Sequence, residues 1–257
     1  MTIYMQTAAR PVKEAPMTEA ERKARVELAA AYRIFDMMGW SLLIFNHITL
    51  RVEGPEPRFL INPFGLHYSE ITASSLLLVD LEGNVLRESR WPMNRAGFVI
   101  HSALHEAQPN AHCVMHTHTT TGLAVACLKD GLSPHNFYGA MLQGQVAYHD
   151  FEGISVELGE RERLVRNIGD KRAVILRNHG LLAWGPSVPQ AFLTLWTLQQ
   201  ACDAQIAAAS AGAIHPITPE AIARSVRESG QGEKRTCDDV FAALKRKLDS
   251  IDPSYKE

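Results

Sequence analysis

Residues 112–118 read His-Cys-Val-Met-His-Thr-His, an apolar run that ends in two histidines separated by one residue. The run from 112 to 116 predicts a mostly buried strand, and the polar residues 117–121 predict its end. Because strand side chains alternate between the two faces, His116 and His118 point to the same face. That spacing presents two imidazoles as ready metal ligands, although paired histidines also serve as ordinary hydrogen-bonding residues.

A third histidine, His179, lies between two other apolar segments. Residues 173–176 and 181–184 predict two strands, and Arg-Asn-His-Gly at 177–180 predicts a tight turn between them. A core residue between two apolar segments would have no reason to be polar, which makes His179 a candidate ligand, although it can also hydrogen-bond within its own loop. Three neutral imidazoles that converge from two strand ends would leave an open position, as catalytic zinc sites do.

The segments on both sides of these histidines alternate between strand and helix patterns. Thr18 followed by Glu21 is a capping-box signature, and apolar residues then recur at helical spacing up to a stop at Gly39. Ser187 and Pro189 begin a long helix whose first half is apolar nearly all round, so we expect it to be buried on several sides. The other runs predict strands at 48–52, 58–61, 76–80 and 145–148, and helices at 98–108, 122–128 and 159–168.

These patterns predict one α/β domain with additions at its two ends. Residues 1–17 have no periodicity and carry two prolines, which is typical of a loose arm. Two helices with charged faces are expected after residue 212. We therefore expect a flexible N-terminal arm at 1–17, an α/β domain at 18–213 and a helical extension at 214–257.

Composition narrows the range of partners. The chain has 257 residues, 46% of them hydrophobic, and a formal net charge of -2, so it can bury a sizeable core but has no basic excess for binding nucleic acid. Four cysteines without a C-x-x-C pair fit neither a zinc ribbon nor a disulfide framework, and they suit a reducing cytoplasm. An apolar leader and a segment of membrane-span length are both absent, so we expect no membrane partner.

Five short motifs, taken together, resemble the class II aldolase/adducin family. They are Phe-Asn-His-Ile-Thr at 45–49, Asn-Pro-Phe-Gly at 62–65, Phe-Val-Ile-His at 98–101, His-Thr-His at 116–118 and Arg-Asn-His-Gly at 177–180. The resemblance runs from about residue 21 to about residue 213 and so covers most of the chain.

This resemblance implies a fold, an assembly and a cofactor. The implied fold is a three-layer α/β/α domain with a mostly antiparallel central sheet, commonly assembled as a homotetramer and acting on a small-molecule substrate. The resemblance also implies that His116, His118 and His179 bind a divalent metal. Zinc is the first choice for these imidazole ligands, and Fe²⁺, Mn²⁺ and Co²⁺ are alternatives.

One motif departs from the sugar-phosphate aldolases of this family. Those enzymes carry Pro-Ser-Ser-Glu before a helix, where the serines hold the substrate phosphate and the glutamate moves protons. The matching stretch here is Asn-Arg-Ala-Gly at 94–97, and Gly97 has no side chain with which to transfer a proton. Arg95 has the geometry to hold a planar carboxylate where the serines held phosphate, or it is a solvated surface charge.

Other site residues follow from the same comparison of motifs. The substrate-binding positions that the resemblance carries over are Asn46, Thr49 and Gly65. The candidates for the missing proton transfer are His101, Tyr138 and His149. Each has a structural alternative: His101 as a helix anchor or a residue that orients a ligand, Tyr138 as a packing residue, and His149 as the polar end of a strand.

The sequence leaves three functions open. A metal-dependent lyase would cleave an aldol or decarboxylate a small oxygenated acid or sugar derivative, and decarboxylation needs the missing base less because carbon dioxide, not a proton, leaves the carbon. A non-catalytic assembly module, as in adducin heads, also fits the missing glutamate. An iron-dependent oxygenase is a further alternative, since three histidines with open positions permit it.

Overall fold

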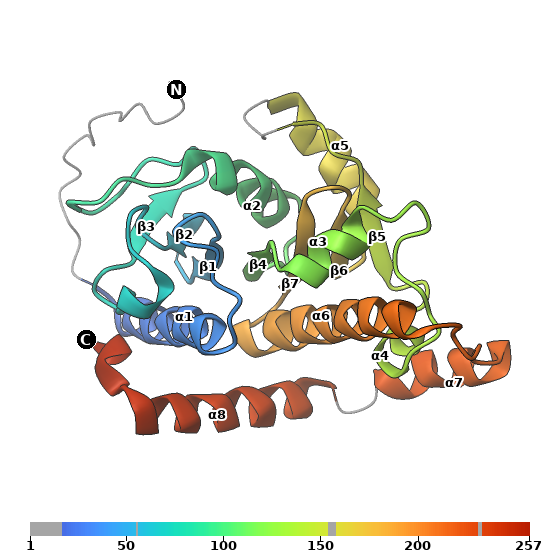
Figure 1. Ribbon diagram of the computed structural model, residues 1–257. Helices are drawn as coiled ribbons and strands as arrows, with labels where there is room; N and C mark the ends of the chain where they lie inside the picture. The colour runs from blue at the N-terminus through green and yellow to red at the C-terminus, as the bar shows by residue number, and fades with distance from the viewer. Residues whose placement is uncertain (1–16, 55, 154–157, 231–232) are drawn as a thin grey trace.

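The computed structural model describes residues 17–54, 56–153, 158–230 and 233–257 (Figure 1). The arm predicted at 1–17 lies outside these residues except for Met17. A seven-stranded sheet forms the centre of the described chain. Its strands are β1 (Ile48–Val52), β2 (Arg58–Ile61), β3 (Leu77–Asp80), β4 (Cys113–Thr117), β5 (Val146–His149), β6 (Ala173–Leu176) and β7 (Gly180–Gly185).

The described part of the chain also has eight helices. They are α1 (Glu19–Met37), α2 (Arg95–Ala107), α3 (Thr120–Ala126), α4 (Phe137–Met141), α5 (Leu158–Ile168), α6 (Val188–Ala211), α7 (Pro219–Ser229) and α8 (Glu233–Ile251). Two 3-10 turns, η1 (Tyr68–Glu70) and η2 (Pro253–Lys256), complete the set. None of the described helices is both long and apolar enough to serve as a membrane span.

The strand order is β3-β2-β1-β4-β7-β6-β5. Every neighbouring pair is antiparallel except β5 and β6, which are parallel. The expectation of a mostly antiparallel sheet is therefore confirmed. β4 and β7 lie side by side at the centre, and this pairing places the end of β4 next to the turn that begins β7.

Alternation along the central strands creates two cores, one on each face of the sheet. Met115 and Ala183 belong to a core that also contains the buried residues of α1 and α6. Their chain neighbours Val114 and Leu182 belong to a second core with Leu104 of α2 and further residues of α5. Figure 1 shows the same layers, with α1 and α6 on one side of the sheet and α2 and α5 on the other, so the three-layer expectation is confirmed.

The first helix begins where its capping residue predicts. The Thr18 side chain accepts a hydrogen bond from the Glu21 amide at 3.1 Å, and Gly39 follows the helix with a φ of 71°. The carboxylate of Glu21 has a different role from that of a capping box, because it is buried and binds Arg25 and Arg87. Thr18 therefore acts as the N-cap, while Glu21 joins the helix to a later loop.

Helix α6 packs on several sides, as its apolar first half predicts. Phe192, Leu195 and Leu198 are fully buried, and the helix contacts β7, α3, α4 and α8. Helix α8 in turn lies along α6 and α1. The domain boundaries expected after residues 17 and 213 stay predictions.

Three helices differ from the sequence prediction by more than one residue. Helix α3 begins and ends two residues before the expected 122–128. Helix α2 begins at Arg95, three residues earlier than expected, and α4 forms inside the segment 132–144 for which no element was expected. The Asn136 side chain caps α4 by accepting a hydrogen bond from the Gly139 amide at 2.8 Å. A five-residue helix that depends on one cap and on packing against α6 carries too little periodicity to be predicted.

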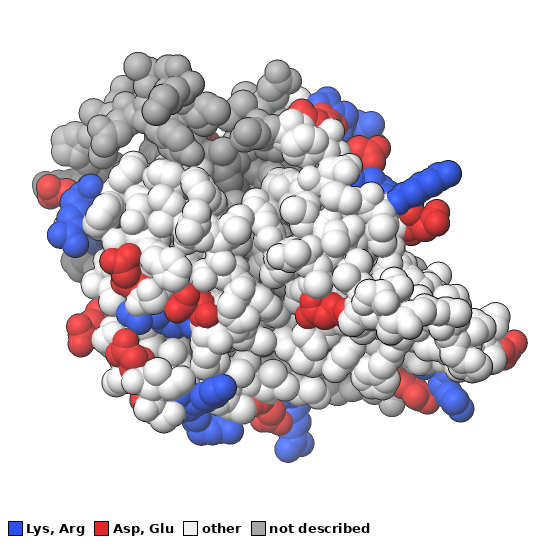
Figure 2. Space-filling view, in the orientation of Figure 1, with Lys and Arg blue, Asp and Glu red and all other residues white. Residues whose placement is uncertain are grey.

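Charged side chains are interspersed near the rim of the face shown in Figure 2. Basic and acidic groups alternate there, and the described atoms at the centre of this face carry few charges. This view agrees with the nearly balanced charge of the sequence.

The role of α6 as the main core helix can be tested by truncating one buried side chain. Leu195→Ala is expected to lower the free energy of unfolding by about 2–5 kcal/mol, because Leu195 is 0% exposed and its removal leaves a cavity. Leu128→Ala is the matched control, since Leu128 is 41% exposed and should change stability by less than about 1 kcal/mol. Urea unfolding measures both variants, and equal losses would contradict the assignment.

Candidate metal centre

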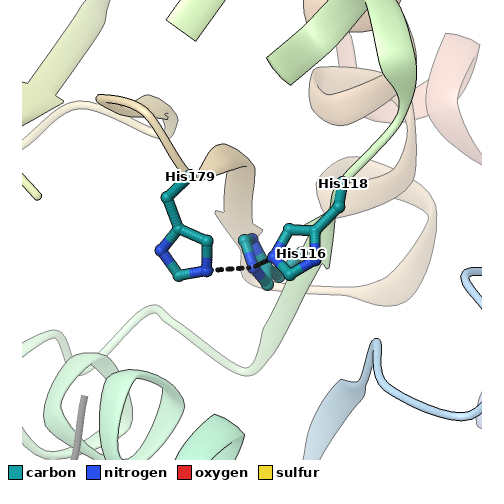
Figure 3. Close-up of side chains that lie close together, drawn as sticks. All are labelled: His116, His118 and His179. Atoms are coloured by element: carbon teal, nitrogen blue, oxygen red, sulfur yellow. Dashed lines mark hydrogen bonds between the residues drawn. The ribbon is translucent and has the colours of Figure 1, made fainter. Parts of the chain in front are cut away.

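The end of β4 and the β6–β7 turn bring His116, His118 and His179 together (Figure 3). The Nε2 atom of His116 lies 2.6 Å from Nε2 of His118 and 3.3 Å from Nε2 of His179. One ligand atom from each ring lies within 4.8 Å of the other two. The structure thus unites three side chains from two separate segments of the chain.

A close backbone approach brings the β6–β7 hairpin this near to β4. The turn is tight, with Asn178 in the left-handed region at a φ of 57°. Gly180 follows, and a Cβ atom at this position would lie 2.3 Å from the backbone oxygen of Thr117 and 2.9 Å from the ring of His118. Only glycine permits this contact, so the glycine of Arg-Asn-His-Gly is a requirement of the site's geometry.

Hydrogen bonding determines which nitrogen of His116 is available. Its Nδ1–H donates to the carbonyl of Leu181 at 2.7 Å, so a neutral ring leaves Nε2 unprotonated. Burial and the imidazoles of His118 and His179 hold the pKa of His116 well below its ordinary value. Neutral rings with free Nε2 atoms are the form of histidine that binds a metal.

The other two rings have the same electrostatic preference. Burial lowers the pKa of His118. Burial, followed by the neighbouring imidazoles of His118 and His149, lowers the pKa of His179 to about 4. All three rings are therefore uncharged at neutral pH, which removes the mutual repulsion that three imidazolium groups would create.

Two of the three nitrogen–nitrogen separations are close to those around a small divalent cation. Two ligands of a tetrahedral zinc ion, each about 2.05 Å from the metal, lie about 3.3 Å apart. The separation between His116 and His179 matches this value, and the separation between His116 and His118 is shorter by less than 1 Å. Three imidazoles also make up the ligand set of known catalytic zinc sites, which keep a fourth position for water or substrate.

A second group of buried histidines lies between β1 and α2. Thr49 Oγ1 is 2.8 Å from Nδ1 of His101 and 2.7 Å from Nε2 of His105. The His101 ring lies 4.2 Å from the ring of His47, which in turn lies 5.9 Å from the ring of His116. This second group therefore reaches the three-histidine cluster through His47.

Sequence reasoning missed His47 as a residue of this region. The signal was present, because His47, Thr49 and Arg51 alternate with apolar residues along β1 and so lie on one face of the strand. That face is turned toward α2, as the contacts of Thr49 and Arg51 with α2 histidines show. Polar residues on this strand face indicate a polar layer rather than an apolar core. We use the name polar layer for His47, Thr49 and Arg51 together with His101 and His105 of α2.

The predicted substrate-binding residues have different surroundings. Asn46 is buried, and its amide donates to the Trp40 carbonyl at 3.3 Å. Gly65 has a φ of 113°, and a Cβ atom there would lie 3.1 Å from the Trp91 ring. Arg95 is the first residue of α2, and its side chain lies outside the described part of the structure.

Thr49 lies within the fold, and its predicted contact with substrate stays a prediction. Thr49 is 0% exposed, and its hydroxyl lies within hydrogen-bond distance of His101 and His105. The structure therefore points to an indirect role for Thr49, through the imidazoles that it contacts.

The three candidates for proton transfer also have different surroundings. His101 lies in the polar layer next to His47, whereas the ring of Tyr138 packs edge-on against Trp196 of α6, 5.4 Å between centroids. Both ring nitrogens of His149 face α5, with Nδ1 3.0 Å from the Asn167 amide and Nε2 3.5 Å from the Glu160 carboxylate. Tyr138 is thus engaged in packing, whereas His101 borders the candidate site through His47, and His149 is close enough to His179 to lower the pKa of that ring.

Comparisons with known proteins identify the family to which the chain is similar. A family model described as the Class II Aldolase and Adducin N-terminal domain matches residues 26–206. The chain belongs to this family. The family resemblance given by the sequence motifs is therefore confirmed.

Two kinds of family member are similar to the chain in sequence. A Caulobacter vibrioides protein named "Putative aldolase class 2 protein" is 44% identical over 243 residues, which cover 94% of this chain and 95% of that protein. Rat alpha-adducin is 46% identical over 198 residues, which cover 76% of this chain but only 27% of the adducin. The family domain is therefore a small part of the longer adducin.

Solved structures of family members have the same fold. An aldolase II superfamily protein from Pseudomonas syringae is 43% identical with a TM-score of 0.89, covering 94% of this chain and 98% of that one. An L-fuculose 1-phosphate aldolase from Glaciozyma antarctica is 30% identical with a TM-score of 0.80, covering 95% and 97% of the two chains. Family membership supports an aldolase-type function for the chain.

Acidification is expected to destabilise the fold through the polar layer. Burial lowers the pKa of His105 to about 3, from an ordinary value of 6.5, so below pH 6.5 the unfolded chain binds this proton more readily than the folded chain. Stability is therefore full above pH 6.5 and falls as the pH drops, by about 2 kcal/mol at pH 5 from this ring alone. Urea unfolding at pH 7 and pH 5 should show a smaller difference for His105→Gln, and an unchanged difference would contradict this assignment.

The close approach at Gly180 gives a second test. Gly180→Ala must move the hairpin away from Thr117, so it is expected to destabilise the chain by about 1–3 kcal/mol and to weaken Zn²⁺ binding by at least about 10-fold. Gly230→Ala is the control, because a Cβ at Gly230 would meet nothing within 4 Å. Competition with a chelating dye measures the affinity, and equal affinities in the two variants would contradict the role of Gly180.

Proposed function

We propose that the chain is a metal-dependent carbon–carbon lyase in which His116, His118 and His179 hold one divalent ion, with zinc as the first choice. The observation that carries this proposal is the convergence of the three Nε2 atoms. The neutral state of the rings and the free Nε2 of His116 support it. Imidazole ligands also accept Fe²⁺, Mn²⁺ and Co²⁺, so the metal content of the purified protein identifies the ion.

A divalent ion held by His116, His118 and His179 would supply a Lewis acid for negative charge on a substrate oxygen beside the bond that breaks. The histidines fix the position of that charge, and the hydrogen bond from His116 to the Leu181 carbonyl fixes the orientation of one ligand ring. Gly97 provides no side chain to transfer a proton at the place where the related aldolases carry glutamate. His101, one helical turn later on α2, is our candidate for that task.

The proposed reaction is aldol cleavage or decarboxylation of a small oxygenated acid or sugar derivative. The Glaciozyma antarctica relative acts, by its name, on L-fuculose 1-phosphate, which supports aldol cleavage of a sugar phosphate. The replacement of the phosphate-holding serines by Arg95 and Ala96 supports an acid substrate, because a guanidinium group matches a carboxylate. Loss of the glutamate also favours the decarboxylation, which does not need a base at that carbon.

A non-catalytic assembly module is the second candidate. The identity with rat alpha-adducin, 46%, exceeds the identity with the L-fuculose 1-phosphate aldolase, 30%, although the compared stretches differ in length. In this case the chain would use its family domain for association rather than for turnover. Metal-dependent turnover of an acid or sugar substrate would exclude this candidate.

We also propose that the chain self-associates as a homotetramer and works in a reducing cytoplasm. Several large apolar side chains are exposed on the described chain, which supports association. The most exposed of these are Leu43, Phe137, Phe151 and Ile251. All four cysteines are free thiols, and three of them are buried, which supports the reducing compartment.

Replacing one ligand tests the lyase. His179→Ala is expected to remove the stoichiometric metal ion and to lower turnover by at least about 100-fold, because two imidazoles hold the ion weakly. Metal content is measured by mass spectrometry, and turnover with L-fuculose 1-phosphate and with a panel of hydroxy and β-keto acids.

The matched control is His215→Ala, since His215 is exposed and lies outside the cluster. This control should keep both metal and activity. A native protein without stoichiometric metal, or a His179→Ala variant with unchanged metal content, would overturn the proposal.

A further inference from the structure

The polar layer between β1 and α2 contains one continuous chain of hydrogen bonds. It starts at the carbonyl of Ala111, which lies 2.6 Å from Nδ1 of His105. It continues from Nε2 of His105 to the hydroxyl of Thr49, at 2.7 Å, and from there to Nδ1 of His101, at 2.8 Å. Thr49 is fully buried, and both histidines are at most 1% exposed, so this chain is shielded from bulk water.

The carbonyl of Ala111 determines the direction of every hydrogen bond in this series. A carbonyl oxygen only accepts, so Nδ1 of His105 must carry a proton. A neutral His105 ring then has a bare Nε2, and Thr49 must donate its only proton to it. The remaining bond of the Thr49 oxygen is an acceptor position, so Nδ1 of His101 must donate to Thr49.

The opposite direction of these hydrogen bonds would require a positive charge on His105. Thr49 could donate to His101 only if Nε2 of His105 also carried a proton, which would make His105 a cation. His105 is buried against the Phe59 ring, 4.3 Å between centroids, and its backbone carbonyl accepts from the guanidinium of Arg51. Burial and the Arg51 charge both oppose an imidazolium at this position, and they lower the pKa of His105 to about 3.

The far end of the hydrogen-bond chain is Nε2 of His101. With its proton on Nδ1, a neutral His101 has an unprotonated Nε2, and this atom is buried without a hydrogen-bond partner among the described residues. A buried acceptor without a partner costs about 1–3 kcal/mol. Native proteins retain such atoms where a bound group or an ordered water satisfies them.

The position of this atom connects it to the candidate metal centre. The His101 ring lies 4.2 Å from His47, and His47 lies 5.9 Å from the metal-ligand candidate His116. His101 also stands four residues after Gly97 on α2, so the two positions share one face of the helix. His101 therefore lies on the side of the helix on which the related aldolases carry their glutamate.

We propose that Thr49 and His105 are positioning residues that lock His101 in the tautomer with a bare Nε2, and that this atom accepts a hydrogen bond from a hydroxyl group beside the metal centre. The hydroxyl belongs to a substrate or to an ordered water. The substrate assignment rests on the proposed function, whereas the locked tautomer does not. This role differs from direct substrate binding by Thr49, because the threonine acts only through the orientation of His101.

Neutron diffraction from crystals of the perdeuterated full chain, grown without substrate, tests the tautomer directly. Deuterium on Nδ1 of His101 and none on Nε2 is the expected result, and deuterium on Nε2 would overturn the proposal. A water that donates to Nε2 in this map assigns the hydroxyl to water. A partner-free Nε2 that gains a bond after L-fuculose 1-phosphate is soaked in assigns the hydroxyl to substrate, and an Nε2 that finds no donor in either map overturns the acceptor role.

Matched threonine variants test the positioning role. Thr49→Val removes the hydroxyl at nearly constant volume, and Thr49→Ser keeps it. Imidazole ¹⁵N spectra of histidine-labelled protein, with His101 assigned from a His101→Asn variant, should show a single tautomer in the native chain and in Thr49→Ser, and a mixture in Thr49→Val. Thr194→Val is the control for loss of a hydroxyl, because Thr194 bonds only the Gln190 carbonyl of its own helix.

These spectra need no turnover, so their outcome is separate from that of the proposed lyase. A single unchanged tautomer in Thr49→Val would overturn the positioning role, even if the protein proves to be a lyase. Where a substrate is turned over, Thr49→Val should lower kcat by about 10-fold or more while Zn²⁺ stoichiometry stays at the native value. If Thr49→Val does not fold, His105→Gln takes its place, and a single native tautomer of His101 in that variant would overturn the role of His105.

Discussion

The antiparallel pairing of β4 with β7 is the constraint on which the candidate site depends. The register places Thr117 opposite Leu181 and His116 opposite Leu182. A slip of one residue would turn the histidines to the opposite face of the sheet, into the apolar core that contains Met115 and Ala183. The register also brings Gly180 against the backbone of Thr117, and this contact carries His179 to the other two rings. The pairing of β4 with β7 therefore determines both the centre of the sheet and the geometry of the candidate site.

Five histidines are kept uncharged by burial, two of them in the polar layer between β1 and α2 and three in the cluster at the end of β4 and the β6–β7 turn. Burial opposes their charged forms, so each of His101, His105, His116, His118 and His179 is held neutral. Neutral rings are satisfied by backbone carbonyls and by one threonine hydroxyl, which costs far less than burying ion pairs. Such a layer stabilises the fold less than aliphatic packing would, and it keeps imidazole nitrogens in fixed directions near the site.

Much of the fold and the cluster could be predicted from sequence because their signals are local. The His-Thr-His spacing, the tight turn around His179 and the capping by Thr18 each depend on a few adjacent residues, and the structure places them as expected. The resemblance of the motifs to the family predicted the three layers and the mostly antiparallel sheet. The helix α4 and the surroundings of Tyr138 and His149 were not predictable, because they depend on packing against α6 and α5. The involvement of His47 and the indirect role of Thr49 required the register of β1 against α2, although the alternation from 47 to 51 already indicated a polar face.

Anomalous X-ray diffraction at the zinc absorption edge, from crystals of the full chain grown with Zn²⁺, tests the central claim most directly. The account predicts one anomalous peak per chain, about 2.0–2.1 Å from the Nε2 atoms of His116, His118 and His179, with a fourth position open to solvent. A peak bound by other residues, or a map in which the three rings approach one another without an ion between them, would contradict it.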